Sequence, residues 1–369
     1  MKKHYFLLII FNCLLFFVKG QNSRQWSTYF GGNDLDYGNN ITTDLFGNVY
    51  ITGNTSSAAN ISTPGTHQTS LGGGPNDAFL AKFNNSGVLQ WSTYYGGYLD
   101  DNAYAVKTDA AGNVYIAGIT SSNDSIATPG LHQTVNNGGL DAFVVKFNSS
   151  GVRIWGAYYG GSNADYLSGL AIDASGNVYI CGSTQSISSI STPGSFQPNI
   201  DTTGSYPDAF VAKFSNNGNF LWGTYFGGNG TDLASDVATD FLGNVIISGF
   251  TYSTNNISTP GSFQSNFSGS QDAFVAKFNS AGNLAWSTYY GGPYNVTYGN
   301  GITCGPDGSI YLAGNTNDTS GIATPGSHQP NFGGFFDAYL VKFGMTGNRI
   351  WSTYYGGTAN EEPTKVWLM

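Results

Sequence analysis

One seven-residue stretch constrains the fold more than any other feature of this sequence, because it occurs six times at nearly constant spacing. The last copy reads WSTYYGG at residues 351–357, and the other copies differ from it at no more than two positions. Successive copies are 65, 64, 67, 64 and 65 residues apart. A repeat of this length is typical of a propeller or another array of several short strands. The copies begin at Trp26, Trp91, Trp155, Trp222, Trp286 and Trp351, which we interpret as core anchors.

The residues between these copies repeat as well and fit four short strands per unit. In one unit we expect strands at Ala103–Thr108, Val114–Gly118 and Ala142–Asn148, followed by the strand that carries the tryptophan. The turns DAAGN (109–113) and NSSG (148–151) combine a side chain that can bond its own backbone with a glycine that supplies positive φ. Because the first strand is rich in small residues, we expect it innermost, with the tryptophan strand outermost.

The third strand of each unit is apolar on both faces, which indicates the class of fold. A sheet that is buried on both faces needs a neighbour on each side, and radially stacked blades provide one. Gly is 52 of 369 residues and charged residues are only 9%, which suits a β-rich chain with many turns. We predict an all-β fold, a β-propeller of four-stranded blades, with complete repeats at about 33–97, 98–161, 162–228, 229–292 and 293–357.

The N-terminal residues 1–20, MKKHYFLLIIFNCLLFFVKG, have the order of a secretory signal peptide. Two lysines precede an apolar run of fourteen residues, which is too short to span a bilayer as a helix. We predict cleavage after Gly20, no later membrane span, and a domain over 21–369 that is secreted or at the cell surface. Removing residues 1–20 leaves 10 basic and 22 acidic residues, a net charge near −12, which argues against a nucleic-acid surface.

Both ends of the repeat array are incomplete. The chain begins with a lone outer strand at Trp26, and residues 358–369 start a repeat that breaks off. In that fragment Glu361 and Val366 match the innermost strand, whereas the last three residues do not. A closed propeller usually completes one blade with strands from both termini. We therefore expect either a truncated reading of a longer propeller or closure as five blades with one spare strand.

The repeated motifs WSTYYGG, DxxGNVYITG, TPGxHQ and DAFxAKFN closely resemble the β-propeller repeat of the SBBP family, which occurs in exported and surface proteins of bacteria. The resemblance covers roughly residues 26–357. It implies the propeller fold and a cell-surface setting, and the family carries no assigned reaction.

An aspartate opens the third strand of every repeat, and a lysine follows five residues later. The two positions have opposite parity, so each aspartate lies on the other strand face from its lysine and cannot pair with it. A buried lysine needs a partner, and we expect a structural ion pair or hydrogen-bond network. The aspartates are Asp77, Asp141, Asp208, Asp272 and Asp337, and the lysines are Lys82, Lys146, Lys213, Lys277 and Lys342.

A second acidic series lies four residues past each Gly-Gly pair. Ca²⁺ prefers six to eight oxygen ligands, and one carboxylate per blade falls short unless backbone carbonyls contribute. We expect these acids to cap turns and keep them as weak metal candidates. The fifth repeat has no acid here and has Gly305 where other repeats have a turn aspartate. The series comprises Asp36, Asp101, Asp165, Asp232 and, in the terminal fragment, Glu361.

Histidines and arginines do not form a catalytic constellation. The fifth position of TPGxHQ holds a histidine in three copies and a phenylalanine in two, so it requires a flat ring rather than a proton carrier. The three arginines each precede a tryptophan by two residues on outer strands of different blades, so they cannot converge on a substrate. These residues are His67, His132, His328, Phe196 and Phe263, and Arg24, Arg153 and Arg349.

The long loop between the second and third strands is the best candidate for a binding surface. It has 22 residues between Gly118 and Asp141, and loops of this length are usually functional or structured. Its STPG core suggests a packed turn, and the variable residues around it are rich in Ser, Thr, Asn and Tyr. We predict an exported, non-catalytic binding or adhesion scaffold for a glycan or protein, without cofactor. Two alternatives remain, a polysaccharide hydrolase or lyase at the centre of the same face, and loops that are merely solvated.

Overall fold

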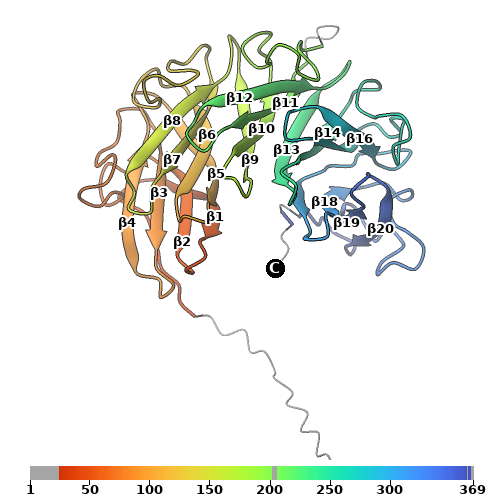
Figure 1. Cartoon of the computed structure of the whole chain (residues 1–369). Helices are drawn as coiled ribbons and strands as arrows, with labels where there is room; N and C mark the ends of the chain where they lie inside the picture. The colour runs from red at the N-terminus through yellow and green to blue at the C-terminus, as the bar shows by residue number, and fades with distance from the viewer. Residues whose placement is uncertain (1–24, 202–205, 364, 367–369) are drawn as a thin grey trace, which may run out of the picture.

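The protein is an open propeller of five blades. The structure, a computed structural model, describes residues 25–201, 206–363 and 365–366. Within these residues the chain forms twenty strands and no helix, arranged in five four-stranded antiparallel sheets (Figure 1). The predicted all-β fold of four-stranded blades is confirmed. The signal peptide expected at 1–20 lies outside the described residues, and none of the described segments is a helix long and apolar enough to cross a membrane.

Each sheet is one blade, numbered 1 to 5 along the chain, and within a blade the strands pair in chain order. Blade 1 comprises β1 (Asp36–Thr43), β2 (Val49–Thr55), β3 (Asp77–Phe83) and β4 (Leu89–Tyr95). Blade 2 comprises β5 (Asp101–Thr108), β6 (Val114–Thr120), β7 (Asp141–Phe147) and β8 (Arg153–Tyr159). Blade 3 comprises β9 (Asp165–Ile172), β10 (Val178–Thr184), β11 (Asp208–Phe214) and β12 (Phe220–Phe226). Blade 4 comprises β13 (Asp232–Thr239), β14 (Val245–Thr251), β15 (Asp272–Phe278) and β16 (Leu284–Tyr290), and blade 5 comprises β17 (Gly301–Cys304), β18 (Ile310–Thr316), β19 (Asp337–Phe343) and β20 (Arg349–Tyr355).

The first strand of each blade lies at the centre of the propeller. Strands β1, β5, β9, β13 and β17 contact one another in this order, from one blade to the next. Their small side chains permit this close approach, as the sequence predicts. The tryptophan strands β4, β8, β12, β16 and β20 are the outermost.

The tight turns have the predicted chemistry. Asp109 Oδ1 accepts hydrogen bonds from the amides of Ala111 (3.0 Å) and Asn113 (2.9 Å), and Gly112 has a φ of 79°. The second hairpin of the blade repeats this arrangement, with Asn148 Oδ1 accepting from Ser150 N–H at 2.9 Å. Both turns therefore form from local hydrogen bonds and one residue with positive φ.

The hydrophobic core lies between blades rather than within them. Every residue of β7, β11 and β15 is buried. Side chains on one face of β7, such as Val144, pack in a single cluster with Phe210 and Phe214 of β11 in the next blade. A blade alone would leave both faces of its third strand in water, so each blade depends on its neighbours for its core.

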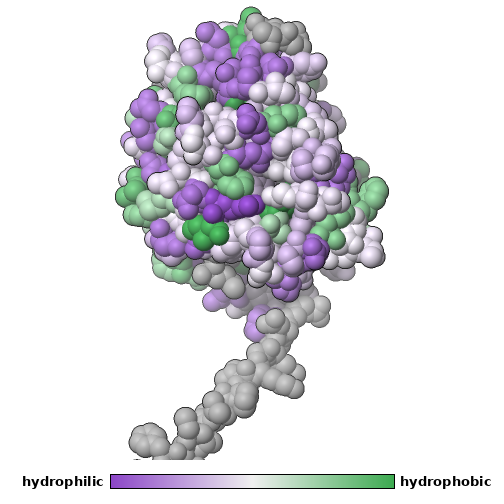
Figure 2. Space-filling view, turned by 90° about the vertical axis from the view of Figure 1, so that its right-hand side faces the viewer, coloured by the Kyte–Doolittle hydropathy of each residue, from purple (hydrophilic) through white to green (hydrophobic). Residues whose placement is uncertain are grey.

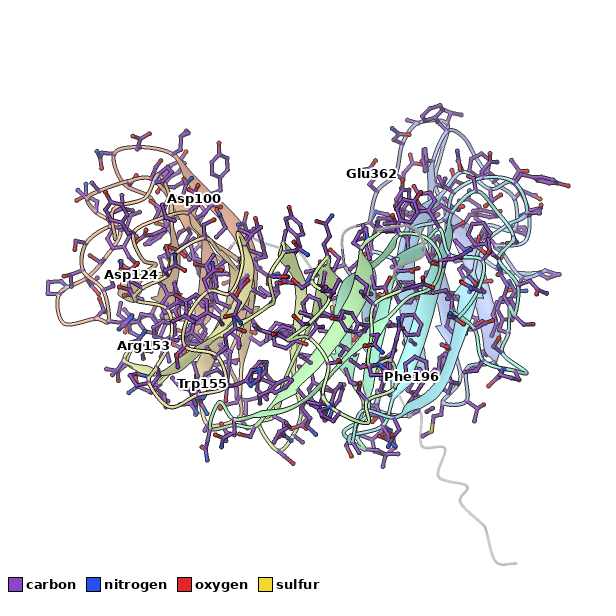
Figure 3. All side chains as sticks on the ribbon, turned by 90° about the horizontal axis from the view of Figure 1, so that it is seen from above. Asp100, Asp124, Arg153, Trp155, Phe196 and Glu362 are labelled. Carbon is purple, nitrogen blue, oxygen red and sulfur yellow. The ribbon has the colours of Figure 1, made fainter. Side chains whose placement is uncertain are left out.

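The two ends of the array do not meet. Figures 1 and 3 show blade 1 and blade 5 on opposite sides of an opening. The expected alternative of closure as five blades is therefore wrong for this structure. The side chains that would fill such a junction are exposed, with Ile41 of β1 at 58% and Tyr355 of β20 at 67%.

The lone outer strand predicted at Trp26 is also wrong, because residues 25–35 form no strand. An outermost strand is held by the third strand of its own blade, and no described strand pairs with this segment, although Trp26 and Phe30 pack against blade 1. Residues 358–363, 365 and 366 likewise form no strand beyond one bridge, Asn360 to Phe336. They lie against β17, where Asn300 Nδ2 donates to Pro363 O at 2.9 Å. The terminal fragment thus takes the innermost position that its pattern predicts.

Candidate functional site

The first five of the six repeated tryptophans each contact the blade that follows them along the chain. Trp155 Nε1 donates to Asn216 O at 2.9 Å, in the outer hairpin of blade 3, and a Cβ on Gly218 of that hairpin would lie 2.7 Å from the Trp155 ring. Gly218 has a φ of 82°, so this position needs glycine on two grounds. The same bond joins Trp26 to Asn85, Trp91 to Ser149, Trp222 to Ser280 and Trp286 to Met345.

The two tyrosines of the repeated stretch have different partners. The first, for example Tyr158, donates to Ser122 O of its own blade at 3.0 Å. The second, Tyr159, donates to Ile190 O of the next blade at 2.6 Å and is fully buried. Tyr95 and Tyr290 repeat this second bond. The WSTYYGG stretch therefore joins one blade to the next through its tryptophan and its second tyrosine. The sequence pattern alone does not show this role.

The Gly-Gly pair separates two buried carboxylates. A Cβ on Gly160 would lie 2.6 Å from Asp141 Oδ1 and 2.7 Å from Asp165 Oδ2, so only glycine fits between them. Asp165 Oδ2 accepts from the Gly161 amide (2.7 Å), and Asp141 Oδ2 accepts from Gln133 Nε2 (2.6 Å). Both side chains are fully buried, and Asp141 Oδ1 has no hydrogen-bond partner. The acid that opens the third strand of blade 2 thus meets the post-glycine acid of blade 3.

The same meeting of the two acidic series recurs along the propeller. Burial, assisted by the neighbouring Asp101, raises the pKa of Asp77 to about 7, and burial raises the pKa of Asp141 to about 6. Two buried carboxylates on either side of one glycine disfavour being ionised together. No group of three or more His, Cys, Asp or Glu that could hold a metal occurs in the described part of the chain. The pairs are Asp77 with Asp101, Asp141 with Asp165, Asp208 with Asp232, and Asp337 with Glu361.

The junction between blades 4 and 5 uses another acid. The fifth repeat lacks the post-glycine acid, and Asp318, which follows β18, takes its place. Its Oδ2 accepts from the Gly292 amide at 3.1 Å and its Oδ1 accepts from the Asn295 amide at 2.9 Å. A carboxylate therefore lies at the same point in space at this junction as at the others, although it comes from a different position of the sequence repeat.

The repeated lysines lie under the turns of the first hairpin. Lys277 Nζ is 2.9 Å from Asp240 Oδ2, and Lys146 Nζ is 3.6 Å from Asp109 Oδ2. In blade 5, Lys342 pairs with Asp307 at 3.3 Å, two residues after the Gly305 that replaces the usual turn aspartate. The other two donate to carbonyls of the next blade, Lys82 to Ser149 O (3.1 Å) and Lys213 to Ser280 O (3.0 Å).

Histidines and arginines of the described residues act in packing. His132 stacks on Phe220 with ring centroids 4.1 Å apart, and burial lowers its pKa. Phe196 packs on Phe226 and Phe278, as His67 packs on the corresponding Tyr95 and Phe147. Arg153 donates to the carbonyls of Ser125 (2.8 Å) and Ile126, and Arg349 donates to those of Gly321 and Ile322, on different blades. Arg24 lies outside the described residues.

The long loops run along the outer edges of the blades. Thr128 N–H donates to Gly156 O at 2.8 Å and Tyr158 N–H donates to Gln133 O at 3.3 Å, so the loop pairs with the free edge of β8. The packed turn predicted for the STPG core is confirmed. A covered edge cannot pair with another chain, which protects the propeller from edge-to-edge association. Figure 2 shows this outer side near blades 4 and 5, with hydrophobic residues scattered among hydrophilic ones.

A groove of about 460 Å³ lies between the long loops of blades 3 and 4. Phe196, labelled in Figure 3, is 40% exposed and contributes an aromatic face. Asn256 stands on the other side with a φ of 61°, a left-handed conformation that asparagine tolerates. The apolar lining is completed by Pro260 and Leu284, and the polar lining by Asn199, Asp201, Ser258 and Thr259.

Sequence reasoning missed a charged cluster near the axis of the propeller. Lys107 of β5, Asp236 of β13 and Lys365 line a cavity of about 190 Å³. The sequence did contain an indication of this cluster, because Lys107 and Asp236 are charged residues in strands that are otherwise rich in small residues.

Comparison with known proteins agrees with this architecture. A model of the SBBP β-propeller repeat matches residues 25–61, 154–187 and 285–321, each beginning at or next to a tryptophan of the repeated stretch. These three stretches of the chain thus match the SBBP β-propeller repeat, which confirms the repeat family that the motifs predict.

Relatives are distant. An uncharacterized WD repeat-containing protein of Acanthamoeba polyphaga mimivirus is 24% identical over 326 residues, 74% of this chain and 24% of the relative. The regulatory protein FlaEY of Caulobacter vibrioides is 24% identical over 203 residues, 53% of this chain and 20% of the relative. The chain spans about a quarter or less of the length of these relatives. A gluconolactonase structure from Xanthomonas campestris is 12% identical with a TM-score of 0.33, over 74% of this chain and 68% of that one, a likeness too low to bear on activity.

Proposed function

We propose that this chain is an exported, non-catalytic binding scaffold that takes a glycan in the groove between blades 3 and 4. The observation that carries the proposal is the lining of that groove, where the exposed face of Phe196 stands opposite Asn256 and Ser258. Sugars present an apolar ring face and a rim of hydroxyls, and aromatic rings with amide and hydroxyl side chains match both. Ligand sites in general combine an apolar wall with a few polar groups in this way.

Repetition offers a matched control for this groove. Phe263 occupies the equivalent loop position in blade 4, is 37% exposed and packs on two rings just as Phe196 does. It differs in lying outside the groove, with the Arg349 guanidinium 4.4 Å over its ring. We expect Phe196→Ala to weaken glycan binding at least tenfold and Phe263→Ala to leave it unchanged. The measurement is a glycan array on residues 21–369, followed by calorimetric titration of the best ligand. Absence of glycan binding, or equal loss in both variants, would contradict the proposal.

Export to the medium or the cell surface is part of the same proposal. It rests on the order of charge and hydrophobicity in residues 1–20. Fractionation of cells that produce the full chain, with mass spectrometry of the N-terminus, should find mature protein outside the cytoplasm that begins at residue 21. Full-length protein retained inside the cell would contradict export.

A polysaccharide hydrolase or lyase is the alternative. Its reaction needs acids that reach the substrate, and the acid pairs with raised pKa values are unsuited to it, because Asp77, Asp101, Asp141 and Asp165 are all 0% exposed. Assays of the purified protein on polysaccharides should therefore release no new reducing ends. Turnover that survives Phe196→Ala would favour the enzyme instead.

A further inference from the structure

A second pocket, between blades 1 and 2, is lined by one lysine and by amide and hydroxyl side chains. Its volume is about 400 Å³. The long loop of blade 1 contributes Thr66, the third and outermost strands of that blade contribute Lys82, Gln90 and Trp91, and the outer hairpin of blade 2 contributes Ser150. No described residue of its lining is acidic, and none of them lines the groove between blades 3 and 4. The pocket is therefore a separate candidate for a ligand.

Lys82 differs from the lysines at the same position of the other repeats. In blades 2, 4 and 5 this lysine lies 2.9–3.6 Å from a turn aspartate, and in blade 3 it is only 6% exposed. Lys82 is half-buried and, among the described residues, forms no ion pair with the turn aspartate Asp44 or with any other acid. Its Nζ donates to Ser149 O at 3.1 Å and lies 5.3 Å from the centre of the Tyr50 ring. An ammonium group has three donors, so two remain for a ligand.

The residue before the tryptophan is also unusual in blade 1. Gln90 stands at this position, whereas blades 2 to 5 carry isoleucine, leucine or alanine. Its Nε2 donates to Val88 O at 3.0 Å, and its amide oxygen has no hydrogen-bond partner among the described residues. Since four blades form the same strand with an aliphatic residue here, the blade junction does not require this amide. It is therefore available to a ligand in the pocket.

We propose that this pocket binds a sugar acid, a monosaccharide unit that carries a carboxylate. Lys82 supplies a charge-assisted hydrogen bond to the carboxylate. The side chains of Gln90, Thr66 and Ser150 match ring hydroxyls, and the Trp91 ring, 7% exposed, adds a small apolar edge. Ligand pockets in general have volumes on the order of 300–1,000 Å³, and this one is near the lower end, which suits one sugar unit. The proposal uses other residues than the groove of blades 3 and 4 and does not rest on it.

The test titrates the protein of residues 21–369 with galacturonate, galactose and acetate at equal ionic strength in a calorimeter. Galacturonate should bind saturably. Galactose, which lacks the carboxylate, and acetate, which lacks the ring, should each bind at least tenfold more weakly. Trigalacturonate distinguishes the two sources of such a unit. Tighter binding of the trisaccharide than of the monosaccharide assigns the ligand to an acidic polysaccharide, and equal binding assigns it to a free sugar acid.

Variants of the lysine position separate binding from folding. Lys82→Met should weaken galacturonate binding at least tenfold. Lys342 occupies the same repeat position in blade 5 and is paired with Asp307, so Lys342→Met is the matched control and should bind as the unaltered protein does. Melting temperatures of both variants show whether each is folded at the temperature of the titration.

Gln90→Leu keeps the proposal testable if Lys82→Met does not fold, because it introduces the residue that blade 3 carries at this position. It should weaken galacturonate binding about fivefold and leave the melting temperature unchanged. Phe196→Ala should leave galacturonate binding unchanged, so a failure of this site and a failure of the groove give different results. No saturable binding of galacturonate, equal binding of galactose or acetate, or unchanged affinity in folded Lys82→Met and Gln90→Leu would overturn the proposal.

Discussion

The internal junctions and the two end faces of the propeller are built from the same repeat positions in opposite environments. Val106 of β5 is 0% exposed, whereas Ile41, at the same position of β1, is 58% exposed. Tyr95 is 0% exposed, whereas Tyr355, its counterpart in the last copy, is 67% exposed. The difference teaches that the repeated residues act between blades, so the contribution of each copy to stability depends on the blade that follows it.

The second tyrosine of the repeated stretch gives the largest expected contrast. Tyr159 is fully buried, bonds Ile190 O and contacts the rings of Phe210 and Phe214. Tyr159→Ala should lower the free energy of unfolding by about 3–5 kcal/mol, as for other large core truncations. Tyr355→Ala should cost less than about 1 kcal/mol, since that side chain is mostly in water. Urea unfolding measures both free energies. Similar losses in the two variants would show that the contribution of this tyrosine does not depend on a following blade.

The first glycine of each pair should show the same dependence. Alanine at Gly160 would place its Cβ within 2.7 Å of two fully buried carboxylates, and overpacking of this kind costs about 1–3 kcal/mol. At Gly356 the corresponding contacts are Asp337 and the partly exposed Glu361, which can move away into solvent. Thermal unfolding of Gly160→Ala should therefore start at a clearly lower temperature than that of Gly356→Ala. If Gly356→Ala unfolded at the lower temperature instead, burial of the second carboxylate of each pair would not determine the cost of alanine at the glycine.

The buried acid pairs should make the propeller more stable in mild acid than at neutral pH. Burial raises the pKa of Asp77 and Asp208 to about 7 and of Asp141 and Asp272 to about 6, from 3.8. A raised folded-state pKa means that the stabilisation is present below about pH 4 and is lost as the pH rises through 6 to 7. The loss should be on the order of 1 kcal/mol for each pair.

Melting temperatures between pH 5 and pH 8 at constant ionic strength check this expectation. Asp141→Asn should melt higher than the unaltered protein at pH 8 and show a shallower pH dependence, because it cannot ionise. A melting temperature that rises steadily from pH 5 to pH 8 would show that the pairs are ionised and stabilised in some other way.

The smallest effect is expected at the histidines of the long loops. His132 stacks on Phe220, and two other copies carry phenylalanine at this position. His132→Phe should change the free energy of unfolding by no more than about 0.5 kcal/mol. A loss of several kcal/mol, seen in the same urea titration, would show a role beyond packing.

The sequence predicted local structure well, because hairpins and strands depend on nearby residues. The turn at Asp109, the small residues of the innermost strands and the apolar third strands all follow from patterns within one repeat. Contacts between blades could not be predicted in this way. The meeting of Asp141 with Asp165 across Gly160 joins two blades, and nothing in either repeat indicates which carboxylates face each other.

Features that depart from the sequence repeat were the most difficult to predict. The expected outer strand at Trp26 fails because a strand needs a neighbour as well as a suitable sequence. Asp318 replaces the missing acid of the fifth repeat from a different position, and only the three-dimensional arrangement shows this substitution. Lys107 and Asp236 are 129 residues apart, and their proximity follows from the curved arrangement of the innermost strands around one axis.

The central claim is that each copy of WSTYYGG joins its blade to the next, and the tryptophans test it most directly. Urea unfolding should be measured for the alanine variants of Trp91, Trp155, Trp222, Trp286 and Trp351. The first four contact a following blade, and each substitution should cost about 3–5 kcal/mol. Trp351 lies in β20, the outermost strand of blade 5, and no described blade follows it, so its substitution should cost about 1 kcal/mol. An equal loss in all five variants would contradict the account, because the tryptophan would then act within its own blade.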